Sequence, residues 1–383
     1  MGRMRIAGLM LLTAAFLAAC APAGERPTRT IQNGVETVMN RLAPYKVKNE
    51  SGSFSLNEEL ALDLEREDLA ARGLTHPRGF EVALGGEMLV LAQSGVFVFD
   101  RTGRFLRQFG RSGRGPGEYQ NPGRLRVLDT GELAFYDEGG AKFLYFNVEG
   151  ELLREIRNAS KLKLFGSNGA LCLGRDGYLF EELDFDPTQD RMEYHLTLTD
   201  ADFHKKARLA ESMSKENPLK ANRYNLFDGR IRYAVSDGRI YAASQGGPDF
   251  EVNIYDFQGR RLRSVQKEWR KVPIPQSFKD AALGAAKGAI WSMLRKKGYW
   301  PDDFPAIKEL YVDGRGRLLV ETYEAGSAGG ETMVDVFSPD GTFIGEQPVA
   351  PASARFIKGD RFFALLEKED GFQRMTVSKM TWR

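Results

Sequence analysis

The sequence predicts an all-β fold built from repeated four-stranded antiparallel units, and three repeating features support this. A glycine followed by alternating apolar residues occurs six times, beginning at Gly86, Gly131, Gly169, Gly238, Gly316 and Gly359. A second pattern alternates with it, in which a strand end, a polar turn, a glycine and a new strand follow one another, as in "FDRTGRFL". Apolar runs precede the first pattern, as in "RLRVLD". Period-two alternation with glycine-containing turns is typical of strands joined by hairpins.

The length of the repeat predicts how these units assemble. Four strands in roughly 40 to 50 residues is the period of a β-propeller blade, so six units predict a six-bladed β-propeller over residues 31–383. The last unit ends with "FQRMTVSKMTWR" and lacks an outer strand. An open strand edge invites aggregation, so we expect the segment 33–39, "NGVETVM", to close the ring.

Residues 1–19 have the features of a secretory signal peptide. A basic start with two arginines precedes an apolar run, residues 6–16, that is too short to span a bilayer. The next residues, "LAAC", resemble the lipobox of bacterial lipoproteins. The resemblance implies cleavage before Cys20 and acylation of its thiol and of the new amine. An ordinary signal peptide with an incidental cysteine is the alternative.

Cys20 would hold the protein on a membrane, because two or more acyl chains anchor stably where one does not. Residues 20–30 are rich in Pro, Gly and charge and are expected to form a short tether. Ala21 is not an acidic retention signal, so the outer membrane is the expected location. Cys172, in "GALCLG", is expected to be a small buried residue rather than a disulfide partner.

The stretch 109–122, "FGRSGRGPGEYQNP", and the blade pattern after it carry a family resemblance. They resemble the NHL-type six-bladed propellers of secreted bacterial lipoproteins, in which a "G.GPGEF..P" loop precedes such a blade. Most of the chain fits this pattern, least well around residues 179–227. The resemblance implies the propeller fold and an exported lipoprotein, and its motifs specify the fold far better than an activity.

The connections are distributed unequally between the two faces of the expected propeller. In an antiparallel blade, the turns between strands one and two and between strands three and four share one face, here called the turn face. The other connections share the opposite face, here called the loop-rich face, and they include the long segments 109–122, 181–191, 210–225, 267–304 and 324–332. Function tends to lie in long loops on a rigid scaffold, so we expect a site on the loop-rich face, around the central axis.

The largest insertion, at about residues 267–304, contains the only predicted helix, "SFKDAALGAAKGAIWSMLRKKG". Ser277 with Asp280 resembles a capping box at its start, and Gly298 follows its basic last turn. Its apolar stripe consists of Phe278, Ala282, Ala286, Ile290 and Met293. We expect this stripe to pack on the propeller.

The glycine-rich loop does not have the sequence of a phosphate-binding loop. The spacing G-x-x-x-x-G-K-[ST] is absent, no helix is predicted to follow, and prolines remove amide donors. Arg111 and Arg114 are therefore either solvated charges or ligand-binding residues of the loop-rich face, together with Glu118 and Tyr119.

Two further groups of residues are candidates for binding. Asp184, Asp186 and Asp190 could hold a divalent metal such as Ca²⁺, although their segment lacks the glycine and the closing glutamate of an EF-hand. A solvated acidic loop is the alternative. Tyr299 and Trp300 could form a platform for a sugar or peptide, or they could anchor the insertion to the blades. The three histidines lack metal-ligand spacing, and no cofactor is expected.

The net charge of the chain indicates which classes of partner are disfavoured. The chain has 54 Lys and Arg against 52 Asp and Glu, and two of the arginines belong to the signal peptide. The mature chain is thus neutral overall, which disfavours nucleic acid as a partner.

We therefore expect a lipid-anchored envelope propeller that binds a protein, peptide or glycan and is not an enzyme. The candidate residues of its loop-rich face are Arg111, Arg114, Glu118, Tyr119, Asp184, Asp186, Tyr299 and Trp300. The alternative is a metal-dependent hydrolase or lyase with a divalent ion in the central channel.

Overall fold

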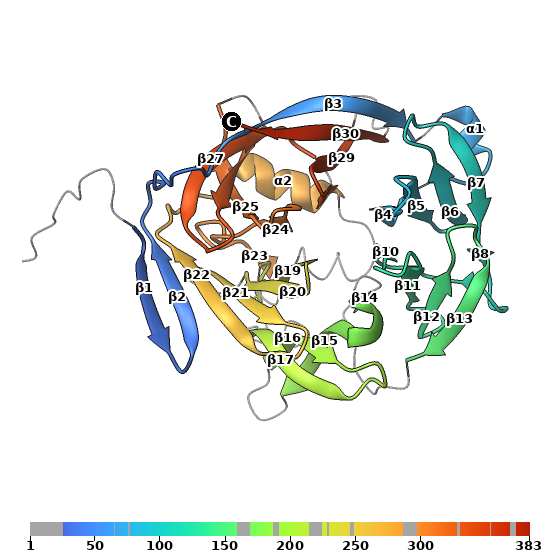
Figure 1. Ribbon diagram of the computed structural model, residues 1–383, viewed down its shortest axis with the longest axis horizontal. Helices are drawn as coiled ribbons and strands as arrows, with labels where there is room; N and C mark the ends of the chain where they lie inside the picture. Colours follow the sequence, from blue (N-terminus) through green and yellow to red (C-terminus); the bar gives the residue numbers. More distant parts are fainter. Residues whose placement is uncertain are drawn as a thin grey trace, which may run out of the picture.

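Each repeat of the sequence folds into one antiparallel blade in the computed structural model, and six blades surround a central axis (Figure 1). The fold is a six-bladed β-propeller, as predicted. The structure describes residues 26–64, 66–75, 77–158, 169–186, 191–213, 224–227, 230–245, 249–285, 296, 298–327, 330–352, 354–367 and 373–383. The signal peptide, Cys20, His76 and Asp190 lie outside these residues.

The blades follow one another around the ring in chain order. Blade one contains β4 (Gly79–Val82), β5 (Met88–Ala92), β6 (Gly95–Phe99) and β7 (Phe105–Phe109). Blade two contains β10 (Arg126–Val127), β11 (Leu133–Asp137), β12 (Lys142–Phe146) and β13 (Leu152–Arg157). Blade three contains β14 (Ala170–Cys172), β15 (Tyr178–Asp186), β16 (Arg191–Thr199) and β17 (Lys205–Met213), with the 3-10 helix η1 (Gly174–Asp176) in its first turn.

The second half of the ring is built in the same way. Blade four contains β19 (Ile231–Ser236), β20 (Arg239–Ser244), β21 (Phe250–Asp256) and β22 (Arg261–Lys267). Blade five contains β24 (Glu309–Val312), β25 (Leu318–Ala325), β26 (Thr332–Phe337) and β27 (Phe343–Val349). Blade six contains β28 (Ala354–Lys358), β29 (Arg361–Glu367), β30 (Gln373–Trp382) and β3 (Phe54–Asp63).

The ring closes by pairing a strand near the start of the chain with the last strand. β3 is the outer strand of blade six and pairs antiparallel with β30, with Phe54 opposite Trp382. Closure by an N-terminal segment was expected, but the predicted segment was wrong. Residues 33–39 belong to the hairpin of β1 (Thr28–Gln32) and β2 (Val35–Asn40), and β2 pairs in parallel with β22 of blade four. That hairpin widens blade four to six strands.

Adjacent blades are held together by apolar side chains between their facing sheets. Each of the six interfaces contains its own cluster of buried residues, as expected when the alternate residues of each strand face opposite neighbours. Phe97, Phe99 and Leu62 lie between blades six and one, for example. Cys172 is buried between blades two and three, as predicted, and the structure shows it unpaired.

Blade three differs from the sequence prediction in two respects. Gly169 precedes the innermost strand β14, and the glycine equivalent to Gly86 or Gly131 is Gly177, which has a φ of +115° and lies against the Thr199 carbonyl. In addition, residues 181–186 and 210–213, predicted as loop, continue β15 and β17. Their polar side chains hid the strands.

The helix within the insertion begins at Gln276, one residue before the predicted start at Ser277. α2 spans Gln276–Ala285, and the Gln276 amide donates to Asp280 Oδ1 at 2.8 Å, so Ser277 does not cap the helix. Of the predicted stripe, Phe278 packs on an aromatic cluster, whereas residues 286–295 lie outside the described chain. The other described helix is the short α1 (Glu67–Ala70). Neither is long and apolar enough to cross a membrane.

Candidate functional site

The glycine-rich loop between blades one and two is a compact structural unit. β8 (Arg111–Ser112) pairs in parallel with β9 (Glu118–Tyr119). Glu118 folds back over the loop, where it accepts the Gly115 N–H at 2.7 Å and the Arg111 Nε–H at 2.6 Å. These bonds hold the pKa of Glu118 below its usual value. A Cβ at Gly113 would lie 2.0 Å from the Glu118 carboxylate, so a side chain there would require Glu118 to move.

The four candidate residues of this loop therefore have different surroundings. Tyr119 is fully buried, and its hydroxyl donates to the Ala92 carbonyl at 3.3 Å. Glu118 is occupied within the loop, and Arg111 is exposed but paired with it. Arg114 is exposed. The structure brings these residues together in a loop that joins blades one and two, and within the described chain Arg114 is the exposed one of the four that forms no ion pair.

Asp184 and Asp186 lie on β15 rather than in a loop. Asp184 Oδ2 lies 3.4 Å from Arg208 and 3.8 Å from His195 Nε2, so its charge has local partners. Within the described chain, the cluster suited to a metal ion is instead Asp200, Asp202 and His204, in the exposed turn that connects β16 and β17. Asp200 Oδ1 accepts the backbone N–H groups of Asp202 and His204, so this cluster is held together as a turn.

Tyr299 and Trp300 hold the insertion on the propeller. Tyr299 lies on β23 (Gly298–Tyr299), which pairs in parallel with β18 (Tyr224–Asn225). Trp300 packs edge-to-face on Phe227 and on Phe278 of α2, with ring centroids 5.4 Å apart in both pairs. The same aromatic cluster reaches blade five, because Phe304 stacks on Tyr323 at 4.2 Å. This packing matches the anchoring alternative.

A set of charged residues that the sequence analysis did not single out lies at the axis. β4, β10, β14, β19 and β24 are the strands closest to the axis in Figure 1. Within the described chain, five blades place a basic residue where their innermost strand begins on the loop-rich face. These residues are Arg78, Arg124, Arg230, Lys308 and Arg355. Arg78 stands near the end of strand two, since its N–H donates to the Leu91 carbonyl, whereas Lys308 and Arg355 lie opposite the middle of that strand in their blades.

Arg124 connects blades that are not neighbours. Its guanidinium lies 4.3 Å above the ring of Tyr233 in blade four, and 3.6 Å from Glu181 of blade three. Because blade three separates blades two and four, this contact crosses the axis. Tyr233 is buried, and its hydroxyl has no hydrogen-bond partner of good geometry although Glu181 lies beside it.

Two further arginines complete the group on the side of blade four. Arg232 lies 3.4 Å from Glu309 of blade five, and its buried Nε–H has no hydrogen-bond partner. Arg230 is exposed at its tip and forms no ion pair within the described residues. We call Arg124, Glu181, Arg230, Arg232, Tyr233 and Glu309 the axial cluster. It combines three permanent cations with two carboxylates.

The electrostatics of the axial cluster are governed by its partial removal from water. Burial raises the pKa of Glu181, and nearby Arg124 offsets only part of this effect. Burial lowers the pKa of Arg230, and the like charge of Arg232 lowers it further. For Arg124, burial is outweighed by Tyr233, Glu181 and Glu309, so its pKa is raised. The cluster therefore has more positive charge than its own carboxylates neutralise.

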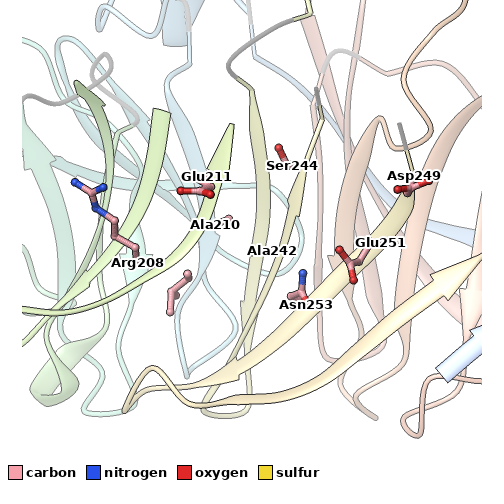
Figure 2. Close-up of a pocket in the computed structure, with 9 residues that line it drawn as sticks. Arg208, Ala210, Glu211, Ala242, Ser244, Asp249, Glu251 and Asn253 are labelled. Carbon is pink, nitrogen blue, oxygen red and sulfur yellow. The ribbon is translucent and has the colours of Figure 1, made fainter. Parts of the chain in front are cut away.

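A groove of about 500 Å³ opens between blades three and four (Figure 2). It is lined by Arg208, Leu209, Ala210, Glu211, Ala242, Ser244, Asp249, Glu251 and Asn253. Glu251 is engaged by Ser264 at 2.7 Å and by Gln266 at 2.9 Å. Ser244 lines the groove, and the next residue, Gln245, donates its backbone N–H to the Arg230 carbonyl. The groove therefore ends beside the axial cluster.

The axial cluster does not fit the divalent ion of the hydrolase or lyase alternative. Such ions prefer several carboxylate or carbonyl oxygens that converge without competing cations. Here Glu181 faces Arg124, and Glu309 faces Arg232. A cation would have to displace both arginines, so the geometry suits a negatively charged ligand better.

Comparisons with known proteins agree with the fold. The model of the DUF5128 family, a 6-bladed beta-propeller, matches residues 84–266. A Bacteroides fragilis protein described as a candidate exported protein is 16% identical with a TM-score of 0.53, over 91% of this chain and 99% of that one. A Bacteroides vulgatus protein of the duf4221 family is 10% identical with a TM-score of 0.48, over 87% of this chain and 100% of that one. No curated protein sequence matches the chain. The comparisons thus define the class of this chain by its fold, the six-bladed β-propeller.

A sequence signal for the axial cluster did exist. A basic residue precedes the first strand of a blade in "HPRGF", "NPGRLRV", "DGRIRYA", "AIKELY" and "ASARF". It becomes visible only when the repeats are aligned on their innermost strand, whereas the glycine turns align them on the second strand. The contacts among Arg124, Glu181 and Tyr233 come from three different blades and could not be read from any one repeat.

Proposed function

We propose that this protein is an exported, lipid-anchored propeller of the bacterial cell envelope that binds a protein, peptide or glycan on its loop-rich face. The axial cluster carries the proposal, because buried donors without partners are rare in folded proteins and each costs about 1 to 3 kcal/mol. Among the described residues, the Arg232 Nε–H is such a donor, and the nearby Tyr233 hydroxyl lies beside Glu181 without a hydrogen bond of good geometry. The adjoining groove offers room for a ligand that extends away from the axis.

The anchor in this proposal rests on the lipobox-like sequence before Cys20 and on the candidate exported protein of the same fold. The tether from Cys20 leads into β1, whose residues are all exposed. Outer-membrane attachment follows from the absence of an acidic residue at position 21.

Site-specific photo-crosslinking tests the binding face. A photoreactive phenylalanine analogue is placed at Arg78 and Asp249, which are exposed on the loop-rich face, and at Thr130 and Asp237 on the turn face. In cells of the source organism, adducts are expected from the first pair and not from the second. Adducts confined to Thr130 and Asp237 would show that the proposed face is wrong.

A further inference from the structure

The axial cluster lacks one negative charge. Arg124, Arg230 and Arg232 face Glu181 and Glu309, and the carboxylate of Glu181 is itself disfavoured by burial. Charges held away from bulk water are costly unless they are paired. Arg230 is exposed and forms no ion pair within the described chain, so it is the cation of the cluster that is available to a ligand.

The available donors have the geometry of a carboxylate site. An arginine presents a planar fork of N–H groups that matches the two oxygens of a carboxylate. Arg230 and Arg232 are two residues apart on one strand segment and lie close enough for the charge of Arg232 to lower the pKa of Arg230. Gln245 stands beside them, with its amide donating to the Ile307 carbonyl at 2.9 Å and its own buried Oε1 without a partner. A ligand that combines a carboxylate with an N–H donor would satisfy both features.

The site is compact, which distinguishes between classes of acidic ligand. Its cations converge on the axis, whereas a repeating polyanion carries charges along a line and needs a basic track. The groove that leads away from the axis contains the carboxylates of Glu211, Asp249 and Glu251 instead (Figure 2). A chain whose charge is confined to one end fits this arrangement better than an acidic polysaccharide.

We propose that the axial cluster binds the carboxylates at the acidic C-terminal end of a peptide segment. Arg230 and Arg232 pair with these carboxylates, and the groove holds the preceding residues of the peptide. This inference rests on the proposed function, since it names the ligand class of the same face. Arg230 makes the specific contact, because it is the arginine of the cluster that is exposed as a residue and forms no ion pair among the described residues.

Fluorescence anisotropy with defined probes tests this assignment on the mature chain. The probe is a labelled pentapeptide of four alanines ending in glutamate with a free carboxyl group, and its control is the amidated peptide ending in glutamine. We expect the acidic peptide to bind and Arg230→Gln to weaken its binding about 10- to 100-fold, as for loss of a charge-assisted hydrogen bond. Arg230→Lys should restore part of the affinity. Arg104→Gln, at an exposed arginine on the turn face, should leave it unchanged.

Each alternative outcome contradicts a defined part of the inference. Equal binding of the acidic and the amidated peptide, or no effect of Arg230→Gln, would overturn the carboxylate site. Trigalacturonate binding more tightly than the peptide would overturn the peptide assignment, and inorganic phosphate competing at equal concentration would overturn the carboxylate preference. If crosslinks still form at Arg78 and Asp249 on the loop-rich face but the acidic peptide does not bind, this inference is wrong and the proposed function stands. If the crosslinks come from the turn face, the proposed function falls as well. Unchanged near-ultraviolet circular dichroism confirms that the variants are folded.

Discussion

A buried ion pair joins blades four and five and makes stability depend on pH. Lys267 Nζ lies 2.9 Å from Asp335 Oδ2, and the two side chains are 2% and 3% exposed. Burial raises the pKa of Asp335 to about 6, although Lys267 opposes this rise. The ammonium group also lies 4.3 Å from the ring of Phe343. The pair is therefore held in an apolar interface where its ionised form is costly.

The raised pKa of Asp335 predicts a loss of stability as the pH rises. Between about pH 4 and pH 6, the native state retains a proton that the unfolded state has released, so the free energy of unfolding decreases. Urea denaturation at pH 4 and at pH 7 measures this effect. From pH 4 to pH 7, the free energy of unfolding of the wild type should decrease by on the order of 2 to 3 kcal/mol more than that of Asp335→Asn. Asp129→Asn, at an exposed position, is the control. A wild-type to Asp335→Asn difference that is independent of pH would contradict the assignment.

The proposed anchor depends on one thiol. Cys20→Ser should move the protein from the membrane fraction to the soluble fraction and abolish labelling by radioactive palmitate, because no acyl chain can then be attached. Cys172→Ser is the control, since that thiol is buried between blades and lies far along the chain. Palmitate labelling that persists in Cys20→Ser would remove the lipobox interpretation and leave an ordinary signal peptide.

At the scale of elements, one type of turn recurs on the turn face, between strands three and four of blades one and four and between strands one and two of blade five. Asp100, Asp256 and Asp313 each accept two backbone N–H groups and pair with an arginine four residues later. In blade three, Asp200 accepts the N–H groups of residues 202 and 204, and His204 takes the place of the arginine at 3.1 Å. The apparent metal cluster of this turn is thus a variant of a structural motif.

The same turn should contribute very differently to stability in different blades. In blade five, Asp313 and Arg317 are each 3% exposed, and the Arg317 guanidinium lies 3.3 Å from the ring of Trp382. Asp313→Ala would leave this arginine buried without a partner, which costs about 3 to 5 kcal/mol. Asp100→Ala, whose Arg104 is exposed, should have a much smaller effect. Chemical denaturation of both variants tests this order, and equal losses would contradict it.

At the scale of the whole molecule, stability depends on the contact between the two ends of the chain. Leu62 of β3 is 2% exposed and packs in the cluster between blades six and one. Leu62→Ala should lower the free energy of unfolding by about 2 to 5 kcal/mol, through lost burial and a cavity. Leu56→Ala on the same strand is the matched control, because Leu56 is 38% exposed. A similar loss in both variants would show that β3 does not close the ring.

The sequence predicted the blades well because each blade is local. Period-two alternation and glycine turns recur within 40 to 50 residues, and they identify strands without any long-range information. Ring closure was assigned to the wrong segment, because 33–39 and Phe54–Asp63 both read as strands and only packing distinguishes their partners. The candidate residues on the loop-rich face remain a prediction, and Arg124, Glu181 and Tyr233 were missed because they meet only when blades two, three and four are assembled.

The pairing of β3 with β30 also sets the order of events during synthesis. Phe54 pairs with Trp382, although almost the whole described chain separates them in sequence. At about 5 to 20 residues per second, β3 waits for roughly a quarter of a minute to one minute before β30 exists. During that interval its edge is free to join another nascent chain. Asn57, Glu58 and Glu59 make the middle of this strand polar and exposed, and two like charges on a waiting edge would repel an identical copy until the proper partner arrives.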